Sequence, residues 1–370
     1  MMRTQWADLA DDLGPEKIVL IREPRLGLEA ILVVDNTAAG PAIGGIRMAP
    51  DISVDEVFRL ARAMTFKNAA AGLRHGGGKA GIVGDPTMPH AEKERLVRAF
   101  GVAIADISDY IPGPDMGIDE ACMAAVYDEI GRVVGLPAAM GGIPLDSLGA
   151  TAFGLAVVAD VAAEYGVVDL DGARVVIQGF GAVGSHAARF LEERGAVTVA
   201  VSDSRGGISD PAGLDLEKLL AWKRAGNAVS EFAGGSPIGH ETMIGLDCEI
   251  WVPAARPDVF GADNAGDVKA KLILAGANIP ATEEAERVFH ERDVLMVPDF
   301  IANAGGVICG AVEFAGGTAT GAFAAIEEKV RANTRAVIGR VQRDGVMPRR
   351  AAGEMAVARV REAMSYRRSF

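Results

Sequence analysis

Short apolar runs alternate with amphipathic segments along the first part of the chain. Two runs rich in Ile, Val and Leu, at 17–21 and 28–34, are typical of β-strands. Apolar residues recur at helical spacing over 53–72 and over 91–107, which predicts two amphipathic helices. A stretch rich in Pro and Gly at 110–117 is predicted to break this pattern. We therefore expect strands and helices to be mixed in an N-terminal α/β domain.

A second alternating segment begins after a cluster of chain breakers at 137–150. An apolar helix is predicted over 151–165, and a last long helical pattern lies around 323–343. Between them, short apolar strands alternate with helical segments, and the predicted strands are 174–178, 197–202, 249–253, 271–275 and 294–297. Strands that alternate with helices indicate a parallel sheet covered on both faces, so the second domain is predicted to be of the Rossmann type.

The composition of the chain narrows the choice of partners. Its 370 residues are enough for two domains. Lys and Arg number 37 against 50 Asp and Glu, and the net charge of −13 disfavours nucleic acid and anionic membranes. Three widely spaced cysteines and five scattered histidines suggest neither a disulfide framework nor a metal site. The N-terminus does not resemble a signal peptide, so we expect a cytoplasmic protein with no membrane partner.

The sequence GFGAVG at 179–184 matches the G-x-G-x-x-G pattern of dinucleotide-binding turns. It directly follows an apolar strand and opens a helix. In such a turn Gly179 allows the tight bend, Gly181 lets the backbone approach a pyrophosphate, and Gly184 permits close packing of helix on sheet. The pyrophosphate would lie at the helix N-terminus, where free N–H groups favour an anion. The candidate pyrophosphate-binding residues are Gly179, Phe180, Gly181, Ala182, Val183 and Gly184.

The three residues that directly follow the predicted strand at 197–202 bear on the choice of cofactor. Asp203 lies about 20 residues past the glycine motif, where an acidic side chain can accept hydrogen bonds from the adenosine ribose. An aspartate that only caps the strand end is the alternative. Ser204 and Arg205 lie just beyond and could accept a 2′-phosphate. NAD is therefore the expected cofactor, with NADP as the alternative.

Lys79 follows three glycines in the stretch RHGGGKAGI at 74–82. A phosphate-binding loop does not fit, because Leu73 stands where that motif needs a glycine and Ala80 lacks the required hydroxyl. Lys79 is therefore either a catalytic amine on a backbone that passes close to a ligand or a solvated lysine in a turn. A partly desolvated lysine near another cation has a lowered pKa and becomes a usable base.

Local sequence also leaves two interpretations open for Lys67 and for Asp115. Lys67 lies on the apolar stripe of the helix predicted at 53–72, so it either extends to water or meets a substrate anion. Asp115 lies in PGPDMG, where it either stabilises a turn or exchanges protons together with a lysine of lowered pKa.

Eight segments together resemble the glutamate/leucine/phenylalanine/valine dehydrogenases, nearest the leucine/phenylalanine branch. They are GPAIGGIRM, MTFKNAAAGLRHGGGKAGI, GPDMG, GATAFG, QGFGAVG, VSDSRGGI, AGANIPAT and PDFIANAGGVICGAVEF, in family order. The resemblance implies reversible NAD(P)-dependent oxidative deamination of an L-amino acid to a 2-oxo acid and ammonia. It also implies that Lys79 is the catalytic lysine, that Asp115 carries protons to and from the substrate nitrogen, and that Lys67 binds the α-carboxylate.

The resemblance further implies the architecture and the remaining site residues. Residues 1–140 would bind substrate, with the helical segment 326–370 packing back on them, and 141–325 would form the NAD(P)-binding domain across a cleft. Candidate substrate-binding residues are Lys67, Gly45, Met64, Ile43, Gly113, Gly310 and Asn278. Thr151, Ala254, Asn278 and Asn303 are further candidates for the cofactor site. The family is usually oligomeric, so a homo-oligomer is expected.

Two positions address the side chain of the substrate. Glutamate enzymes of the family use a lysine where this chain has Ile43, and a serine where it has Gly310. Their loss predicts an apolar pocket for a phenylalanine-like or leucine/valine-like substrate, and the small Gly113 and Gly310 are expected to leave room for a large side chain. Because IPGPDMG and VSDSRGGI look more like glutamate enzymes, glutamate dehydrogenase is the alternative. An inactive dinucleotide-binding sensor is the alternative of another class.

Overall fold

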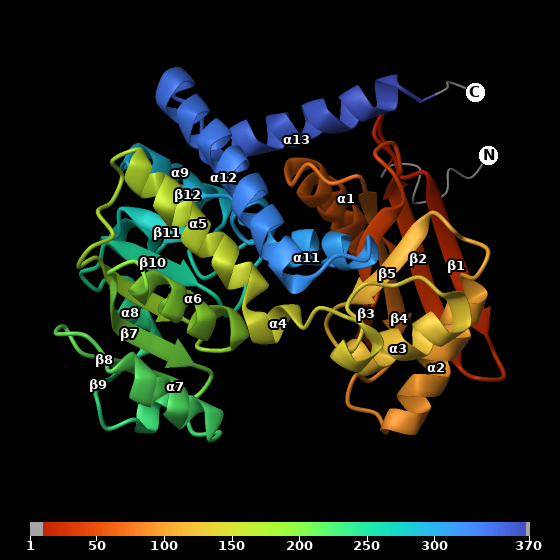
Figure 1. Ribbon diagram of the computed structural model, residues 1–370, viewed down its shortest axis with the longest axis horizontal. Helices are drawn as coiled ribbons and strands as arrows, with labels where there is room; N and C mark the ends of the chain where they lie inside the picture. The colour runs from red at the N-terminus through yellow and green to blue at the C-terminus, as the bar shows by residue number, and fades with distance from the viewer. Residues whose placement is uncertain (1–9, 368–370) are drawn as a thin grey trace. The chain divides into compact units, whose positions relative to one another are not determined.

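The computed structural model describes residues 10–367, and its two compact units are drawn in Figure 1. Unit 1 contains residues 10–145, 307–322 and 353–367. Unit 2 contains residues 146–306 and 323–352. Two segments lie in a different unit from the one expected from the sequence: 307–322 belong to unit 1 although they were expected in the second domain, and 326–352 belong to unit 2 although they were expected with the first.

Unit 1 is built on a five-stranded sheet with the strand order β1-β2-β4-β3-β5. β2 pairs antiparallel with β1 and β4, whereas β3 pairs parallel with β4 and β5. The strands are β1 (Lys17–Glu23), β2 (Leu28–Asn36), β3 (Ala42–Ala49), β4 (Gly76–Val83) and β5 (Tyr110–Pro114). The unit also contains α1 (Val54–Ala70), α2 (His90–Ala103), α3 (Glu120–Ile130) and most of α11 (Gly305–Phe314) and α13 (Pro348–Ser365).

β2 is buried on both faces, which explains why the strand predicted at 28–34 is apolar at nearly every position. Leu32 and Val34 point into the core formed with α2 and α3. Ile31 and Val33 point to the other face, against Phe58 and its neighbours on α1. Because successive side chains of a strand alternate between faces, a strand covered on both sides loses the polar half of its pattern.

The stretch at 110–117 contains a strand, so the break predicted there is wrong for residues 110–114. β5 pairs with β3 alone, at the edge of the sheet. Pro112 and Pro114 are tolerated because an edge strand needs hydrogen-bond donors on one side only. The position of the strand in the sheet, rather than its composition, therefore decided its structure.

Unit 2 is built on a seven-stranded sheet with the order β12-β11-β10-β6-β7-β8-β9, and its five predicted parallel strands are confirmed. The antiparallel strands β8 and β9 extend the sheet beyond β7 and have no counterpart in the sequence analysis. The strands are β6 (Arg174–Gln178), β7 (Val197–Asp203), β8 (Gly206–Ser209), β9 (Ser236–Ile238), β10 (Ile250–Pro253), β11 (Leu272–Leu274) and β12 (Leu295–Val297). The helices include α6 (Ala182–Glu192), α7 (Leu216–Arg224), α8 (His240–Ile244), α9 (Glu283–Glu291) and α10 (Asp299–Ala302).

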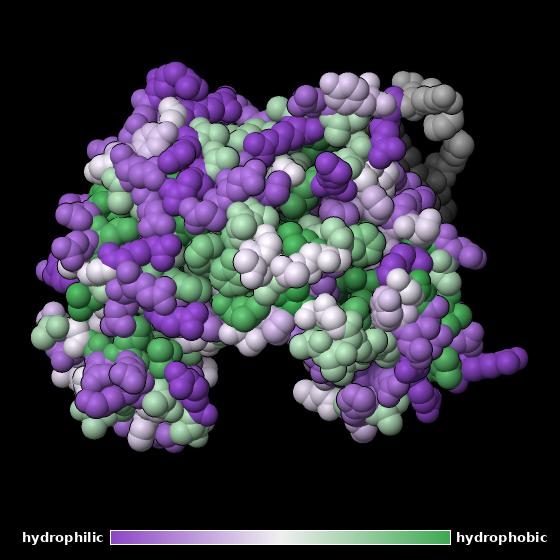
Figure 2. All heavy atoms as spheres, in the orientation of Figure 1, coloured by the Kyte–Doolittle hydropathy of each residue, from purple (hydrophilic) through white to green (hydrophobic). Residues whose placement is uncertain are grey.

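The helix α12 (Ala319–Asp344) confirms the helical pattern predicted around 323–343. Its Phe323 lies against Phe153 of α5 (Ala150–Glu164), with ring centroids 4.9 Å apart. Further along α12, Arg331 pairs with Glu164 at 2.6 Å. These contacts explain why the greater part of α12 belongs to unit 2. In Figure 2 hydrophilic residues lie over the upper part of this helix, whereas white and green residues lie over its lower end.

The helical segment formed by α4 (Leu145–Leu148) and α5 is apolar enough, by length and composition, to cross a membrane. In unit 2, however, the residues of α5 are mostly buried, and 61% of the most apolar window is buried overall. Such burial is typical of the core helix of a globular domain, which needs no polar face.

Candidate functional site

Lys79 lies near the middle of β4, between β2 and β3, with only 6% of its surface exposed. The glycines that precede it are required by packing on both sides of the strand. A Cβ on Gly77 would overlap the backbone of Thr65 in α1, and a Cβ on Gly78 would lie 2.9 Å from the ring of Tyr110. Gly77 and Gly78 therefore let α1 and Tyr110 approach β4 closely, and Lys79 is buried in this packing.

Asp115 follows β5 and meets Lys79, with its Oδ2 2.7 Å from the Lys79 Nζ. The same Oδ2 accepts a hydrogen bond from Nε of Arg47 at 3.0 Å. Gly45 lies beside the pair, because a Cβ at this position would be 2.7 Å from Cβ of Asp115 and 3.3 Å from Nζ of Lys79. The structure thus brings together three of the predicted site residues, Gly45, Lys79 and Asp115. Arg47 also belongs to this group, although it was not among the residues predicted from the sequence.

Arg47 is held in turn by Glu56, whose Oε1 accepts from Nη1 of Arg47 at 2.8 Å. A signal for Arg47 was present in the sequence, because it stands two residues after Gly45 and must share its face of β3. No local pattern indicates Glu56, which lies in the first turn of α1.

The two groups of the central ion pair titrate away from their ordinary ranges. Burial lowers the pKa of the Lys79 amine, and Arg47 lowers it further, although Asp115 opposes both effects. Burial by itself raises the pKa of Asp115, but Lys79 and Arg47 outweigh it and hold that pKa below the ordinary value. The site therefore pairs an ionised carboxylate with an amine whose proton is more easily lost than that of a solvated lysine.

The predicted substrate residues Ile43, Gly113 and Gly310 are grouped around one side chain, Val134. Ile43 lies in a small apolar cluster with Ile111, Val134 and Ala311. A Cβ on Gly113 would lie 2.8 Å from Val134, and a Cβ on Gly310 would lie 3.5 Å from it. Val134, which was not considered from the sequence, therefore fills the room expected beside Gly113, whereas a Cβ on Gly310 would only be in ordinary van der Waals contact with it.

The loop at 133–143 that carries Val134 is fixed by one carboxylate. Glu313 of α11 accepts hydrogen bonds from the backbone N–H groups of Gly135 at 2.7 Å, Leu136 at 3.1 Å and Ile143 at 2.8 Å. Charge-assisted hydrogen bonds of this kind are stronger than those between neutral groups. Glu313 thus ties the loop to the helix that carries Gly310.

The remaining substrate candidates of unit 1 lie on α1. Met64 and Lys67 are both half-buried there. The next residue, Asn68, donates from Nδ2 to the carbonyl of Gly76 at 2.7 Å and fixes α1 to the start of β4. Lys67 is therefore held on a helix that is locked to the strand bearing Lys79.

In unit 2, the glycine motif forms the predicted turn between β6 and α6. Gly179 has φ of +94°, and a Cβ there would lie 2.8 Å from the backbone of Ala254. A Cβ on Gly184 would overlap the carbonyl of Gly179, whereas one on Gly181 would meet nothing within 4 Å. Ala182 and Val183, in the first turn of the helix, are at least partly exposed, and Phe180 is buried. The N-terminus of α6 is thus open for an anion at Gly181.

A cavity of about 440 Å³ adjoins this turn. It is lined by Gln178, Gly179, Ser202, Asp203, Ser204, His240, Ala255 and Arg256. Oε1 of Gln178 and Oγ of Ser202 are buried without a hydrogen-bond partner among the described residues. Unsatisfied buried polar atoms are uncommon, so these two indicate a polar ligand, and the cavity fits the adenosine end of a dinucleotide.

Both carboxylate oxygens of Asp203 have hydrogen-bond partners within the protein, which was not expected from the sequence. Its Oδ2 binds Nζ of Lys223 at 2.5 Å and the N–H of Val229 at 3.2 Å, and its Oδ1 accepts from the N–H of Arg205 at 2.9 Å. Burial raises the pKa of Asp203, but these contacts outweigh burial and hold the pKa below its ordinary value. The negative charge that would repel a 2′-phosphate is therefore largely balanced by Lys223.

Three further candidates lie near one another in unit 2. Nδ2 of Asn303 donates to Oδ1 of Asn278 at 3.0 Å, and Oδ1 of Asn303 is a buried acceptor without a partner among the described residues. Thr151, at the start of α5, lies beside Gly305, where a Cβ would come 3.1 Å from its Cα. Asn278 and Asn303 thus contact each other directly.

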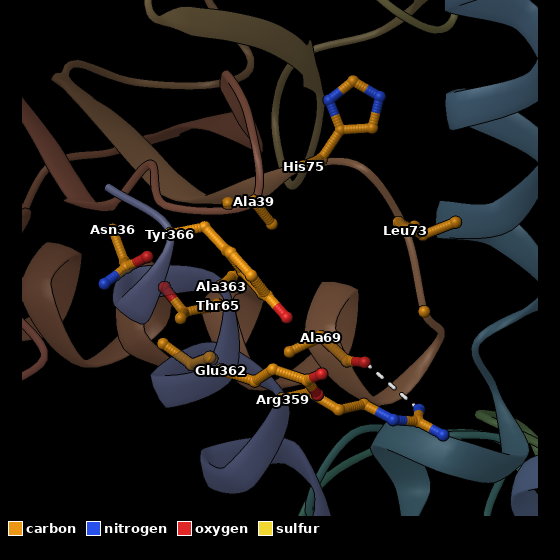
Figure 3. Close-up of a pocket in the computed structure, with 13 residues that line it drawn as sticks. Asn36, Ala39, Thr65, Ala69, Leu73, His75, Arg359, Glu362, Ala363 and Tyr366 are labelled. Atoms are coloured by element: carbon orange, nitrogen blue, oxygen red, sulfur yellow. Dashed lines mark hydrogen bonds between the residues drawn. The ribbon is translucent and has the colours of Figure 1, made fainter. Parts of the chain in front are cut away.

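A second cavity, of about 340 Å³, lies in unit 1 between α1, the start of β4 and α13 (Figure 3). Neither Lys79 nor Asp115 lines it. Figure 3 shows the Arg359 side chain reaching the carbonyl of Ala69, near the C-terminus of α1. A cation at this end of a helix stabilises the last carbonyls, so the polar contact here is a helix cap.

Comparison with known proteins gives a consistent picture. Residues 141–368 match the family model for glutamate/leucine/phenylalanine/valine dehydrogenase, and residues 15–132 match its dimerisation domain. Glutamate dehydrogenase of Aeropyrum pernix is 41% identical over 82% of this chain and 77% of its own length. Glutamate dehydrogenase of Thermotoga maritima is 40% identical over 81% of this chain and 77% of its own length.

Solved structures of amino acid dehydrogenases also match. Hetero-hexameric glutamate dehydrogenase of Thermus thermophilus, in a leucine-bound form, has a TM-score of 0.85 at 32% identity and covers 96% of this chain and 91% of its own. L-Tryptophan dehydrogenase of Nostoc punctiforme has a TM-score of 0.74 at 26% identity and covers 95% of this chain and 98% of its own. The curated relatives named above are glutamate enzymes, so the comparisons support the glutamate alternative better than the apolar substrate.

Proposed function

Because the chain belongs to the glutamate/leucine/phenylalanine/valine dehydrogenase family, we propose that it deaminates an L-amino acid with an apolar side chain. The reaction is reversible, uses NAD(P), and yields the 2-oxo acid and ammonia. The observation that carries the choice of substrate is that Ile43, which stands where glutamate enzymes of the family use a lysine, lies in an apolar cluster with Ile111, Val134 and Ala311. A glutamate carboxylate buried against it without a partner would cost roughly 3–5 kcal/mol.

Lys79 and Asp115 are proposed to divide the proton transfers. Bound NAD(P) supplies the acceptor for the substrate hydride. The neutral amine of Lys79, favoured by burial, takes a proton from the water that adds to the substrate carbon. Asp115 exchanges a proton with the substrate nitrogen, so that ammonia can leave, and Lys67 pairs with the α-carboxylate.

The residues of unit 2 are proposed to hold the dinucleotide. The N-terminus of α6 at Gly181 would bind the pyrophosphate, and the cavity beside Gln178 and Ser202 would bind the adenosine. Asp203 supports NAD, whereas Ser204 and Arg256 in the same cavity support NADP, so we propose that both cofactors bind.

Glutamate is the second candidate substrate. It is favoured by the names of the relatives, which are 40% and 41% identical to this chain. It requires a cation for the side-chain carboxylate other than the lysine that Ile43 replaces.

The two candidates are separated by following NADH and NADPH oxidation with ammonia and a panel of 2-oxo acids. The panel contains phenylpyruvate, 4-methyl-2-oxopentanoate, 3-methyl-2-oxobutanoate, indolepyruvate and 2-oxoglutarate. We expect turnover of one or more apolar acids and little of 2-oxoglutarate. Preference for 2-oxoglutarate would establish the second candidate. Cofactor binding without any turnover would instead identify an inactive sensor.

Two variants of one residue sharpen this test. Ile43→Lys should raise the ratio of kcat/KM for 2-oxoglutarate over the apolar acid by on the order of 100-fold, because it restores a cation in the pocket. Ile43→Met, of similar length but uncharged, is the matched control and should leave the ratio within about threefold. An unchanged ratio in Ile43→Lys would show that the side chain of the substrate does not reach this residue.

We also infer that the chain acts as a homo-oligomer. The match of residues 15–132 to a dimerisation domain supports this inference. Light scattering of the purified protein at micromolar concentration should give a multiple of the 38.5 kDa chain mass.

A further inference from the structure

Four charged side chains form a row across unit 1, from Glu56 through Arg47 and Asp115 to Lys79. The distances along the row are 2.8, 3.0 and 2.7 Å. The side chains are 29%, 22%, 25% and 8% exposed in the same order, so the row runs from half-buried at α1 to buried at β4. Its charges alternate and sum to zero, which is the arrangement that a partly desolvated ion cluster needs.

Arg47 and Lys79 bind the same oxygen of Asp115, Oδ2. A carboxylate has two oxygens, and two cations placed on one of them leave the other as the free acceptor. Lys79 alone would not fix which of the two oxygens of Asp115 is left as the free acceptor, because an ammonium is a point charge that donates in any direction. The planar guanidinium of Arg47 donates in fixed directions, and Glu56 binds its other side. Arg47 can therefore set the orientation of the Asp115 carboxylate, which Lys79 cannot.

We propose that Arg47 is a positioning residue for the proposed proton transfers, which holds Oδ2 of Asp115 and presents Oδ1 to the substrate nitrogen. The proposal rests on the roles assigned above to Asp115 and Lys79. Arg47 acts through Asp115, and Glu56 acts through Arg47 by fixing the guanidinium.

The charges of this row also predict opposite effects from its two outer members. Arg47 lowers the pKa of Lys79 and of Asp115 through its charge, whereas Glu56 raises the pKa of Lys79. Loss of Arg47 should therefore move the rise of activity with pH to higher pH, because Lys79 must lose its proton to act as a base. Loss of Glu56 should move this rise to lower pH. A residue that only stabilised the fold would move neither.

The experiment measures kcat, KM and the pH profile of amino acid oxidation for the full-length wild type and six variants. The test variants are Arg47→Gln, Arg47→Lys and Glu56→Gln. Asp115→Asn and Lys79→Ala report on the proposed function itself. Arg98→Gln is the matched control, because Arg98 binds Glu94, Asp128 and Glu129 between α2 and α3 and no residue of the row. Thermal unfolding is recorded for each variant.

Arg47→Gln should lower kcat by about 10- to 100-fold with KM within about threefold, because it disturbs an acid–base group whose full contribution is about 10²–10⁴-fold. Arg47→Lys should keep the wild-type pH profile and recover part of kcat, since lysine retains the positive charge but lacks the planar guanidinium with its fixed donors. If Arg47→Gln does not fold, the opposite pH shift of Glu56→Gln and the partial activity of Arg47→Lys decide the question.

Two results would overturn the proposal. The first is a wild-type rate and pH profile in Arg47→Gln while Asp115→Asn and Lys79→Ala lose activity. The second is an equal loss in Arg98→Gln, which would make the effect a general one of removing an ion pair. Full activity in Asp115→Asn and Lys79→Ala would instead refute the proposed function on which the inference rests.

Discussion

Replacing Glu313 by glutamine tests whether one carboxylate holds the loop at 133–143. The wild-type side chain accepts hydrogen bonds from the backbone N–H groups of Gly135, Leu136 and Ile143, at 2.7 to 3.1 Å. Hydrogen bonds to a charged group contribute about 1.5–3 kcal/mol each, so the gross contribution is roughly 4.5–9 kcal/mol. Glutamine keeps one acceptor oxygen, and water can reach the half-buried site. We therefore expect Glu313→Gln to lower the free energy of unfolding by about 2–4 kcal/mol.

Glu313→Gln should loosen the loop at 133–143 more than it destabilises the protein as a whole. Hydrogen–deuterium exchange, followed by mass spectrometry on peptides that cover 131–145, should become faster in Glu313→Gln. The KM for the apolar 2-oxo acid should rise, because Val134 belongs to this loop and contacts the positions of Gly113 and Gly310. Glu94→Gln is the matched control, since Glu94 binds Arg98 on α2 and does not touch the loop.

Exchange over 131–145 in Glu313→Gln equal to that of the wild type would show that Glu313 does not hold this loop. The same conclusion would follow if the free energy of unfolding fell by less than about 0.5 kcal/mol, the size expected of an ordinary surface substitution.

Two further predictions concern unit 2. Hydrogen bonds and the charge of Arg174 lower the pKa of Glu249 below its ordinary value of 4.5, so its contribution to stability is complete above that pH and is lost as the pH falls through the lowered pKa. The difference in free energy of unfolding between wild type and Glu249→Gln, measured by denaturant titration, should therefore decrease steadily as the pH is lowered below 4.5. A difference that stays constant with pH would contradict this assignment. Arg256 lines the cavity beside Asp203, so Arg256→Ala should weaken NADPH binding by on the order of tenfold more than NADH binding in fluorescence titrations. Equal weakening would place the 2′-phosphate elsewhere.

Much of the fold could be predicted because its signals are local. Runs of Ile, Val and Leu indicated β1 and β2 of the first sheet and the five parallel strands of the second. Apolar residues at helical spacing indicated α1, α2 and α12. The turn at Gly179 was indicated by a motif whose glycines serve a backbone shape, and the structure gives Gly179 the positive φ that such a turn requires. Local patterns did not reveal β5, because whether a proline is tolerated in a strand depends on how many neighbours the strand has.

The candidate site was predicted in its chemistry more than in its contacts. The sequence indicated a lysine and an aspartate that act as a pair, and the structure brings Lys79 and Asp115 within 2.7 Å. Arg47 and Val134 were missed, because their importance lies in which residues of distant segments they meet. The room expected beside Gly113 is absent for the same reason: a glycine leaves space only if no other side chain fills it.

The sequence by itself determined the alternation of strands and helices, the glycine turn and the identity of the charged residues, since each depends on neighbours within a few positions along the chain. Only the tertiary structure decided which charges meet, as in the row from Glu56 to Lys79, and how the segments after residue 306 are shared between the units. The physical reason is that burial and ion pairing depend on distances between segments that packing alone brings together.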